Sequence, residues 1–237
     1  MPEAREQNSL GVLGGMGGLA SAEFLKTIYE CAGADREQES PVVMVLSDPT
    51  FPDRTEAFLR GDVDVLYARL LQSLHRLGEM GASKFVICCM TMHYLLPRLP
   101  LELRRRVVSL VDIIFANVEQ DHQKYLLLCS TGTQKLRLFQ SQPQWKRMEE
   151  NIVFPDEKDQ AYLHGLIYQV KQSRCIQETL SFLETRRHKY RVDAFVAGCT
   201  EMHILAKHSR IANDNRSRFD WIDPLTIIAR MIADKSL

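Results

Sequence analysis

A gapless internal repeat constrains the fold of this chain more than any other feature of its sequence. Residues 85–95 (FVICCMTMHYL) align on residues 195–205 (FVAGCTEMHIL) with the shared pattern Phe-Val-x-x-Cys-x-x-Met-His-x-Leu. Each copy starts as a short apolar run, which is typical of a buried strand, and the shared cysteine falls where that strand should end. One copy lies in each half of the chain, so the repeat predicts a duplicated unit with a pseudo-two-fold axis.

The rest of the sequence alternates strand-like and helix-like segments. Apolar runs predict strands at 10–13, 41–46, 84–88, 125–129, 194–197 and 221–223. Amphipathic stretches predict helices at 21–31, 63–81, 158–170, 176–187 and 224–235. Because strands that alternate with helices form βαβ units, we expect the α/β class. The chain should form two similar lobes, each with a parallel sheet, and an active site in the cleft between them.

The charge balance limits the partners of this chain. It has 30 Lys and Arg residues and 30 Asp and Glu residues, which gives a formal net charge of zero. Nucleic acids and membrane surfaces require a basic excess, whereas a small carboxylate requires only one or two local cations. The first residues lack the basic start and apolar core of a signal peptide, and no apolar run reaches the length of a membrane span. We therefore expect a cytoplasmic protein that binds neither nucleic acid nor membrane.

Two of the six cysteines stand out, because Cys89 and Cys199 occupy the same position of the repeat. Each falls where a strand ends and a helix begins, and backbone N–H groups there favour a thiolate. Ligands of open α/β sheets bind beyond the carboxyl ends of the strands, so facing lobes should bring both thiols to one cleft. The other cysteines are expected to pack as small structural residues: Cys31, Cys88, Cys129 and Cys175.

A matched pair of thiols suits racemisation at a carbon next to a carboxylate. One thiolate removes the proton from one face of the carbon, and the opposing thiol delivers a proton to the other face. The roles exchange for the reverse direction, and matched residue types are expected because the two enantiomers are near mirror images. A general base also needs a pKa near the working pH, which a tuned thiol can reach.

Three other interpretations are open at this point. Both cysteines could be buried apolar residues, since free cysteine is among the most buried residue types. A tetrahedral zinc site could use the four residues Cys89, His93, Cys199 and His203, in which each Cys and His stand four apart. The glycine-rich segment 15–20 fits the dinucleotide fingerprint, with Asp48 as the acidic residue after the next strand, and so could bind a nucleotide cofactor.

Taken together, the motifs resemble the aspartate/glutamate racemase superfamily, and most closely its aspartate racemase branch. Residues 14–17 (GGMG) resemble the opening glycine motif of that superfamily. Residues 89–93 (CMTMH) and 198–201 (GCTE) resemble the motifs around its first and second catalytic cysteines. The segments 47–49 and 52–55 resemble a segment whose arginine, here Arg54, holds a substrate carboxylate.

The resemblance implies that Cys89 and Cys199 are catalytic, that no pyridoxal phosphate, other cofactor or metal takes part, and that the protein is a homodimer. It also implies two Rossmann-like lobes and a C-terminal helix that returns to the first lobe. We place the first lobe at 1–117 together with the C-terminal segment 218–237, and the second lobe at 118–217. Lys171 takes the place of a lysine that helps to bind a distal carboxylate, and a guanidinium fork such as that of Arg54 suits a carboxylate. The other implied substrate-binding residues are Met16, Met90, Thr91, Thr133, Thr200 and Glu201.

Three positions depart from the pattern of the superfamily. Met90 replaces an asparagine that contacts the amino-acid head group, and methionine cannot make the same hydrogen bonds. Gly18 replaces a proline, and His203 stands where a small or apolar residue is common. We therefore expect a racemase or epimerase of an acidic amino acid or related carboxylate. The alternatives are an isomerase, decarboxylase or tailoring enzyme with a non-standard carboxylate substrate, and a catalytically idle carboxylate-binding protein.

Overall fold

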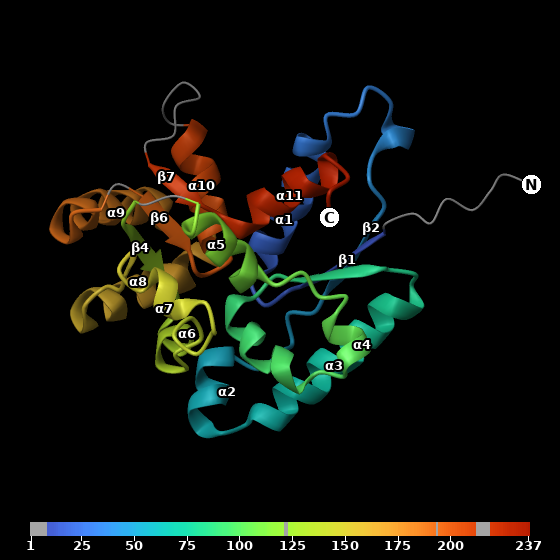
Figure 1. Ribbon diagram of the computed structural model, residues 1–237, viewed down its shortest axis with the longest axis horizontal. Coiled ribbons are helices and arrows are strands. Elements are labelled where there is room, and N and C mark those ends of the chain that lie inside the picture. The colour runs from blue at the N-terminus through green and yellow to red at the C-terminus, as the bar shows by residue number, and fades with distance from the viewer. Residues whose placement is uncertain (1–8, 121–122, 193, 212–218) are drawn as a thin grey trace, which may run out of the picture.

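Two parallel β-sheets lie side by side in the computed structural model shown in Figure 1, which describes residues 9–120, 123–192, 194–211 and 219–237. The first sheet has the order β2-β1-β3 and is formed by β1 (Leu10–Gly14), β2 (Val43–Ser47) and β3 (Lys84–Ile87). The second has the order β5-β4-β6-β7 and is formed by β4 (Tyr125–Leu128), β5 (Ile152–Val153), β6 (Ala194–Ala197) and β7 (Asp220–Ile222).

The two sheets repeat one topology. In each, the first strand in sequence lies in the middle and pairs in parallel with the second strand on one side and the third on the other. Strand β3 is thus the counterpart of β6, and these are the two strands that carry the sequence repeat. The predicted α/β class with two similar parallel lobes is confirmed.

Helices pack against the faces of both sheets (Figure 1). The longer helices are α1 (Gly18–Ala32), α3 (Val63–Glu79), α5 (Leu110–Val118), α8 (Glu157–Val170), α9 (Ile176–Tyr190), α10 (Glu201–Ile211) and α11 (Pro224–Ala233). The shorter helices are α2 (Arg54–Arg60), α4 (Leu101–Arg104), α6 (Thr131–Lys135) and α7 (Trp145–Met148), with 3₁₀-helices η1 (Glu37–Glu39) and η2 (Met90–Arg98). The five helices predicted from amphipathic stretches are all present, within a few residues of their expected ends.

The segment after β3 differs from expectation, because it forms the 3₁₀-helix η2 instead of an α-helix. Pro97 lies inside this segment and cannot donate the backbone hydrogen bond that an α-helix requires there. A 3₁₀-helix has about three residues per turn, so residues four apart do not share a face. The equivalent segment after β6 forms the α-helix α10.

The apolar core crosses the boundary between the lobes. Alternate side chains of a strand point to opposite faces of its sheet. On one face, Val12 and Val86 of the first sheet join Leu127 and Val196 of the second in a single cluster. The opposite faces are covered by separate clusters, one in each lobe. The lobes are therefore held together by packing as well as by the chain.

The C-terminal segment contributes to both lobes. Strand β7 pairs with β6 in the second sheet, whereas helix α11 packs against α1 and α5. The Asp223 side chain caps α11 by accepting a hydrogen bond from the Leu225 N–H at 3.2 Å, and Pro224 takes the first helical position, where no donor is needed. The division of the chain at residue 117 stays a prediction. Among the described residues, no helix combines the length and the apolar character that a membrane crossing requires.

Candidate active site

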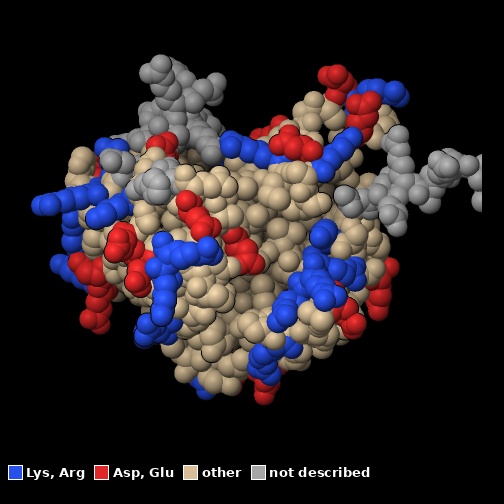
Figure 2. Space-filling model, in the orientation of Figure 1, with Lys and Arg blue, Asp and Glu red and all other residues tan. Residues whose placement is uncertain are grey.

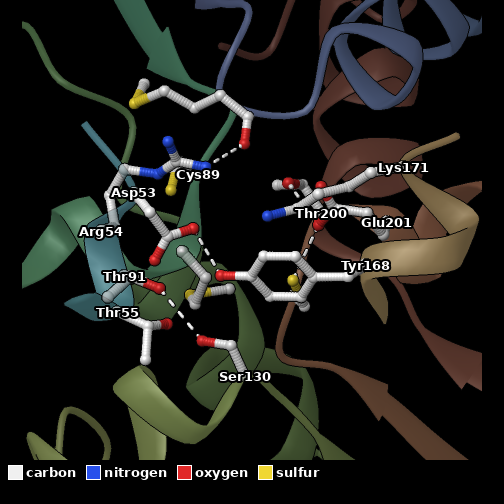
Figure 3. Close-up of a pocket in the computed structure, with 13 residues that line it drawn as sticks. Asp53, Arg54, Thr55, Cys89, Thr91, Ser130, Tyr168, Lys171, Thr200 and Glu201 are labelled. Atoms are coloured by element: carbon white, nitrogen blue, oxygen red, sulfur yellow. Dashed lines mark hydrogen bonds between the residues drawn. The ribbon is translucent and has the colours of Figure 1, made fainter. Parts of the chain in front are cut away.

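The two repeated cysteines lie in one pocket between the lobes. Cys89 follows β3 and Cys199 follows β6, so equivalent strand ends carry the two thiols. Both side chains are nearly covered, with 8% and 9% of their surface exposed, and both line the same pocket (Figure 3). Cys88 points to the other sheet face and packs in the shared core, where burial raises the pKa of its thiol far above the usual range.

Both lobes contribute side chains to this pocket. The first lobe supplies Met16, Asp53, Arg54, Thr55, Cys89, Met90 and Thr91, and the second supplies Ser130, Tyr168, Lys171, Cys199, Thr200 and Glu201. The space left between these side chains has a volume of about 20 Å³, which is room for roughly one water molecule. The side chains of the two lobes thus approach one another closely around the two thiols.

Arg54 places a positive charge beside Cys89. It begins α2, and its guanidinium donates to the carbonyl oxygens of Met16 at 2.6 Å and Pro52 at 3.0 Å. Burial lowers the pKa of Arg54, but the nearby Cys89 sulfur and Asp53 carboxylate outweigh this effect and raise it. Backbone carbonyls thus hold the guanidinium against the first thiol as a permanent cation.

Glu201 places a negative charge beside Cys199. The Cys199 thiol donates a hydrogen bond to Glu201 Oε2, with the two atoms 2.7 Å apart. Burial and the neighbouring carboxylate raise the pKa of Cys199 well above that of a free thiol, and the charge of Lys171 opposes this rise. The two cysteines are equivalent in the fold, but they are not equivalent in charge environment.

Tyr168 and Lys171 reach the pocket from the end of α8. The Lys171 ammonium lies 4.2 Å from the centre of the Tyr168 ring, and the Tyr168 hydroxyl donates a hydrogen bond to Asp53 Oδ2 across the cleft (Figure 3). Burial and the bond to Asp53 raise the pKa of Tyr168. Burial raises the pKa of Asp53, but the hydrogen bonds from Tyr168 and the Glu56 N–H, together with the charges of Arg54 and Lys171, lower it by more, so the net pKa is lowered.

Three hydroxyl groups form a small network between the lobes. Thr91 Oγ1 lies 2.9 Å from Thr133 Oγ1 and 3.3 Å from Ser130 Oγ, and the last two oxygens are 3.1 Å apart. Thr91 and Ser130 line the pocket, but Thr133 is only 1% exposed and does not. The expectation that Thr133 contacts the substrate stays a prediction, and in this structure its hydroxyl is paired with that of Thr91.

The sequence as a whole matches one known family. A family model described as Asp/Glu/Hydantoin racemase matches residues 13–232. The chain belongs to the Asp/Glu/Hydantoin racemase family. It is thus a racemase-like isomerase, in agreement with the resemblance drawn from its motifs.

Solved structures of racemases share the fold of this family member. Aspartate racemase from Picrophilus torridus is 21% identical with a TM-score of 0.78, covering 96% of this chain and 94% of that one. An aspartate racemase homologue from Pyrococcus horikoshii OT3 is 18% identical with a TM-score of 0.65, covering 97% and 99%. Allantoin racemase from Klebsiella pneumoniae is 14% identical with a TM-score of 0.59, covering 95% and 86%.

The two histidines of the repeat, His93 and His203, are hydrogen-bonded outside the pocket. His93 Nε2 accepts a hydrogen bond from the Leu110 N–H at 3.1 Å, so Nδ1 donates to the Cys89 carbonyl oxygen, also at 3.1 Å. Burial lowers the pKa of His93 to about 4. His203 contacts Asp223 at 2.7 Å and Thr27 at 3.0 Å. Both ring nitrogens of each histidine are thus engaged elsewhere, which disfavours the Cys-His zinc site.

Glycines of the glycine-rich segment 15–20 allow neighbouring segments to pack closely. A Cβ atom on Gly15, whose φ is +89°, would lie 2.4 Å from the backbone of Asp48. A Cβ atom on Gly17 would lie 2.1 Å from Glu201 Oε1. The Asp48 carboxylate is bound to Arg69 at 2.6 Å. The glycines are thus explained by close packing, and the acidic group of the fingerprint is already paired, which disfavours the nucleotide interpretation.

Sequence reasoning missed four of the pocket residues, which are Asp53, Thr55, Ser130 and Tyr168. Two of them carried a usable signal. Asp53 directly precedes Arg54, and Tyr168 stands three residues before Lys171, so the two share one face of α8. Thr55 and Ser130 come together only through the packing of α2 against α6, where Gly132 lies against Thr55.

Proposed function

We propose that this chain is a cofactor-independent racemase or epimerase that uses Cys89 and Cys199 to exchange a proton at a carbon next to a carboxylate. One observation carries the proposal: the two thiols lie at equivalent strand ends of a duplicated fold and line one pocket. Two cations, Arg54 and Lys171, line the same pocket. The family supports racemase chemistry of this kind.

The proposed reaction assigns a role to each charged group. Arg54 and Lys171 bind the carboxylate groups of the substrate, and the Arg54 charge lies next to the first thiol. The Cys89 thiolate removes the proton from one face of the carbon, and the remaining electron pair delocalises into the carboxylate. The Cys199 thiol then delivers its proton to the opposite face. The reverse reaction exchanges the two roles.

The substrate that we propose is a carboxylate with a masked amine or an enlarged apolar group. Met90 is 1% exposed and lines the pocket next to Cys89. An ammonium group against its thioether would lose water and gain no strong acceptor, which costs free energy. One structural neighbour is named as an allantoin racemase, so substrates of this fold are not limited to aspartate and glutamate.

The decisive experiment follows solvent deuterium. Amino acids, N-substituted amino acids and dicarboxylates are incubated with the protein in deuterated water and observed by NMR. We expect exchange of the α-proton in at least one carboxylate, accompanied by inversion on chiral analysis. Deuterium exchange separates an enzyme from an idle binder, and chirality of the product separates a racemase from a decarboxylase. Binding of a carboxylate with no exchange in any of them would refute the proposal.

Two further properties belong to the same proposal. We propose a cytoplasmic location and a homodimer, and the family resemblance supports both. Light scattering on the purified protein tests the dimer. A mass of 27.2 kDa in solution, that of one chain, would refute it.

A further inference from the structure

Glu201 is an unusual carboxylate because it is buried with one of its two oxygens unpaired. The residue is 2% exposed. Its Oε2 atom accepts the hydrogen bond from the Cys199 thiol and lies 3.5 Å from Thr200 Oγ1. Among the described residues, its Oε1 atom has no hydrogen-bond partner. Burying a charged oxygen without a partner is costly, so its presence in the pocket calls for a functional explanation.

The glycine loop of the first lobe keeps this carboxylate in place. Gly17 packs so closely on Glu201 that a Cβ atom there would lie 2.1 Å from Oε1. The backbone of Gly17 is extended, with φ of 176°, so a side chain is excluded by space and not by backbone conformation. The loop thus contacts the carboxylate at Oε1, and the Cys199 thiol contacts it at Oε2.

We propose that Glu201 is a positioning residue that holds the proton on Cys199, so that the resting site has one polarity, with Cys89 as the base and Cys199 as the acid. This inference rests on the proposed function and assigns Glu201 a partner within the protein instead of the substrate. The opposite arrangement holds at Cys89, where the neighbouring group is the Arg54 guanidinium. The two thiols occupy equivalent places in the fold, but the different charges of Arg54 and Glu201 assign them different roles as base and acid.

The charged groups around Cys199 and Glu201 have a net effect that keeps the proton on Cys199. Burial and Glu201 raise the pKa of Cys199, and Cys89 adds to the rise, while Lys171 on α8 opposes it. The Glu201 charge also contributes to raising the pKa of Arg54 on α2, across the cleft, and that of Cys88 at the end of β3. When Cys199 gives up its proton during a turnover, its thiolate lies beside a carboxylate. That repulsion favours reprotonation from solvent, which returns the site to its resting polarity while Cys89 releases its proton.

The test replaces Glu201 by its uncharged isostere and measures Cys199 directly. The absorbance of the thiolate is followed as a function of pH in the Cys89→Ser variant, with and without Glu201→Gln. Subtracting the titration of a protein that also carries Cys199→Ser leaves the signal of Cys199 alone. We expect the Cys199 midpoint to fall by about one pH unit or more, which is about a tenfold rise in thiolate at a given pH below the midpoint. An unchanged midpoint would overturn the inference.

Activity provides a second readout on the otherwise native protein. Cys199 must carry a proton to act as the acid, so kcat/KM falls as pH rises through its pKa. Glu201→Gln removes a charge that raises this pKa. The decline of kcat/KM at alkaline pH, which we call the alkaline limb, should therefore move to lower pH. Glu178→Gln, on the exposed start of α9, is the matched control and should leave the limb in place. An alkaline limb at the same pH in Glu201→Gln and native protein would also overturn the inference.

Gly17→Ala gives a second variant that retains every charge. Its new methyl group should push the Glu201 carboxylate away from its present position, and the Cys199 midpoint should fall as it does in Glu201→Gln. A normal midpoint in Gly17→Ala would contradict the role given to the loop. The thiolate titration does not require turnover. Absence of proton exchange in the native protein would therefore refute the proposed function and leave the Glu201 assignment separately tested.

Discussion

The Tyr168 hydroxyl of the second lobe donates a hydrogen bond to the Asp53 carboxylate of the first lobe, across the mouth of the pocket. Asp53 also caps α2 by accepting a hydrogen bond from the Glu56 N–H at 3.0 Å. The space left in the pocket is about 20 Å³, room for roughly one water molecule. We therefore expect this hydrogen bond, which joins the start of α2 to the end of α8, to open when a larger substrate enters.

Tyr168→Phe should loosen the closed state. The lost hydrogen bond is half-exposed, so its net contribution is about 1 kcal/mol after solvent screening. We expect faster amide hydrogen exchange in α2, measured by mass spectrometry. Tyr162→Phe removes an exposed hydroxyl on the same helix, one that bonds Glu178 at 2.6 Å, and serves as the control. Equal protection of α2 in both variants would contradict this role of Tyr168.

Replacing either repeated cysteine should abolish racemisation while the fold persists. A serine hydroxyl is too weak a base at neutral pH to replace the thiolate of Cys89 or Cys199. Each single variant should still exchange the α-proton of one enantiomer with solvent, because one thiol remains. Chiral chromatography and deuterium NMR measure the two effects, and Cys31→Ser is the control. Full racemisation by either variant would rule out the two-thiol mechanism.

The two pocket cations should contribute differently to substrate binding. Arg54→Ala should weaken capture of a carboxylate by about 1.5–3 kcal/mol, the range for hydrogen bonds to charged groups. Arg60→Ala, at the exposed end of the same helix, should have little effect. Lys171→Ala should reduce kcat/KM for substrates with a second carboxylate more than for neutral ones. Equal losses on both substrate types would remove the reason to assign a distal carboxylate to Lys171.

Met90 should make aspartate and glutamate poor substrates. Methionine cannot make the polar contact to the substrate amino group that an asparagine at this position makes. We therefore expect a large gain in kcat/KM for aspartate in Met90→Asn. A competing possibility is that Thr91 and Thr200 supply the missing contacts. Steady-state kinetics on both proteins decide between them. Efficient turnover of aspartate by the native protein, with little change in the variant, would show that Met90 does not govern specificity.

Activity should survive exhaustive chelation and need no added pyridoxal phosphate or nicotinamide. The reason is that two thiols and two cations already supply the acid, the base and the charge stabilisation that the proposed reaction requires. Rates before and after treatment with a chelator test this expectation. Loss of activity that added zinc restores would favour a metal mechanism instead.

Sequence periodicity was sufficient for the fold, because buried strands such as Lys84–Ile87 and Ala194–Ala197 have distinctive apolar runs. The repeat also brings Cys89 and Cys199 to equivalent strand ends. Other features depend on contacts between distant segments, which local pattern does not encode. The meeting of Tyr168 with Asp53 is one such contact. The contact between the Thr91 and Thr133 hydroxyls is another.

The apolar cluster shared by the two sheets has a consequence for how this protein came to its present form. Val12 and Val86 of one half belong to the same apolar cluster as Leu127 and Val196 of the other. If the two halves derive from one duplicated unit, as the sequence repeat indicates, a half-length unit with the same strand order would have had to associate with a second copy to bury that face. Fusion of two such copies would make that association permanent. It would also allow the surroundings of the two thiols to diverge, with Arg54 beside one and Glu201 beside the other, which no symmetric pair of identical chains could achieve.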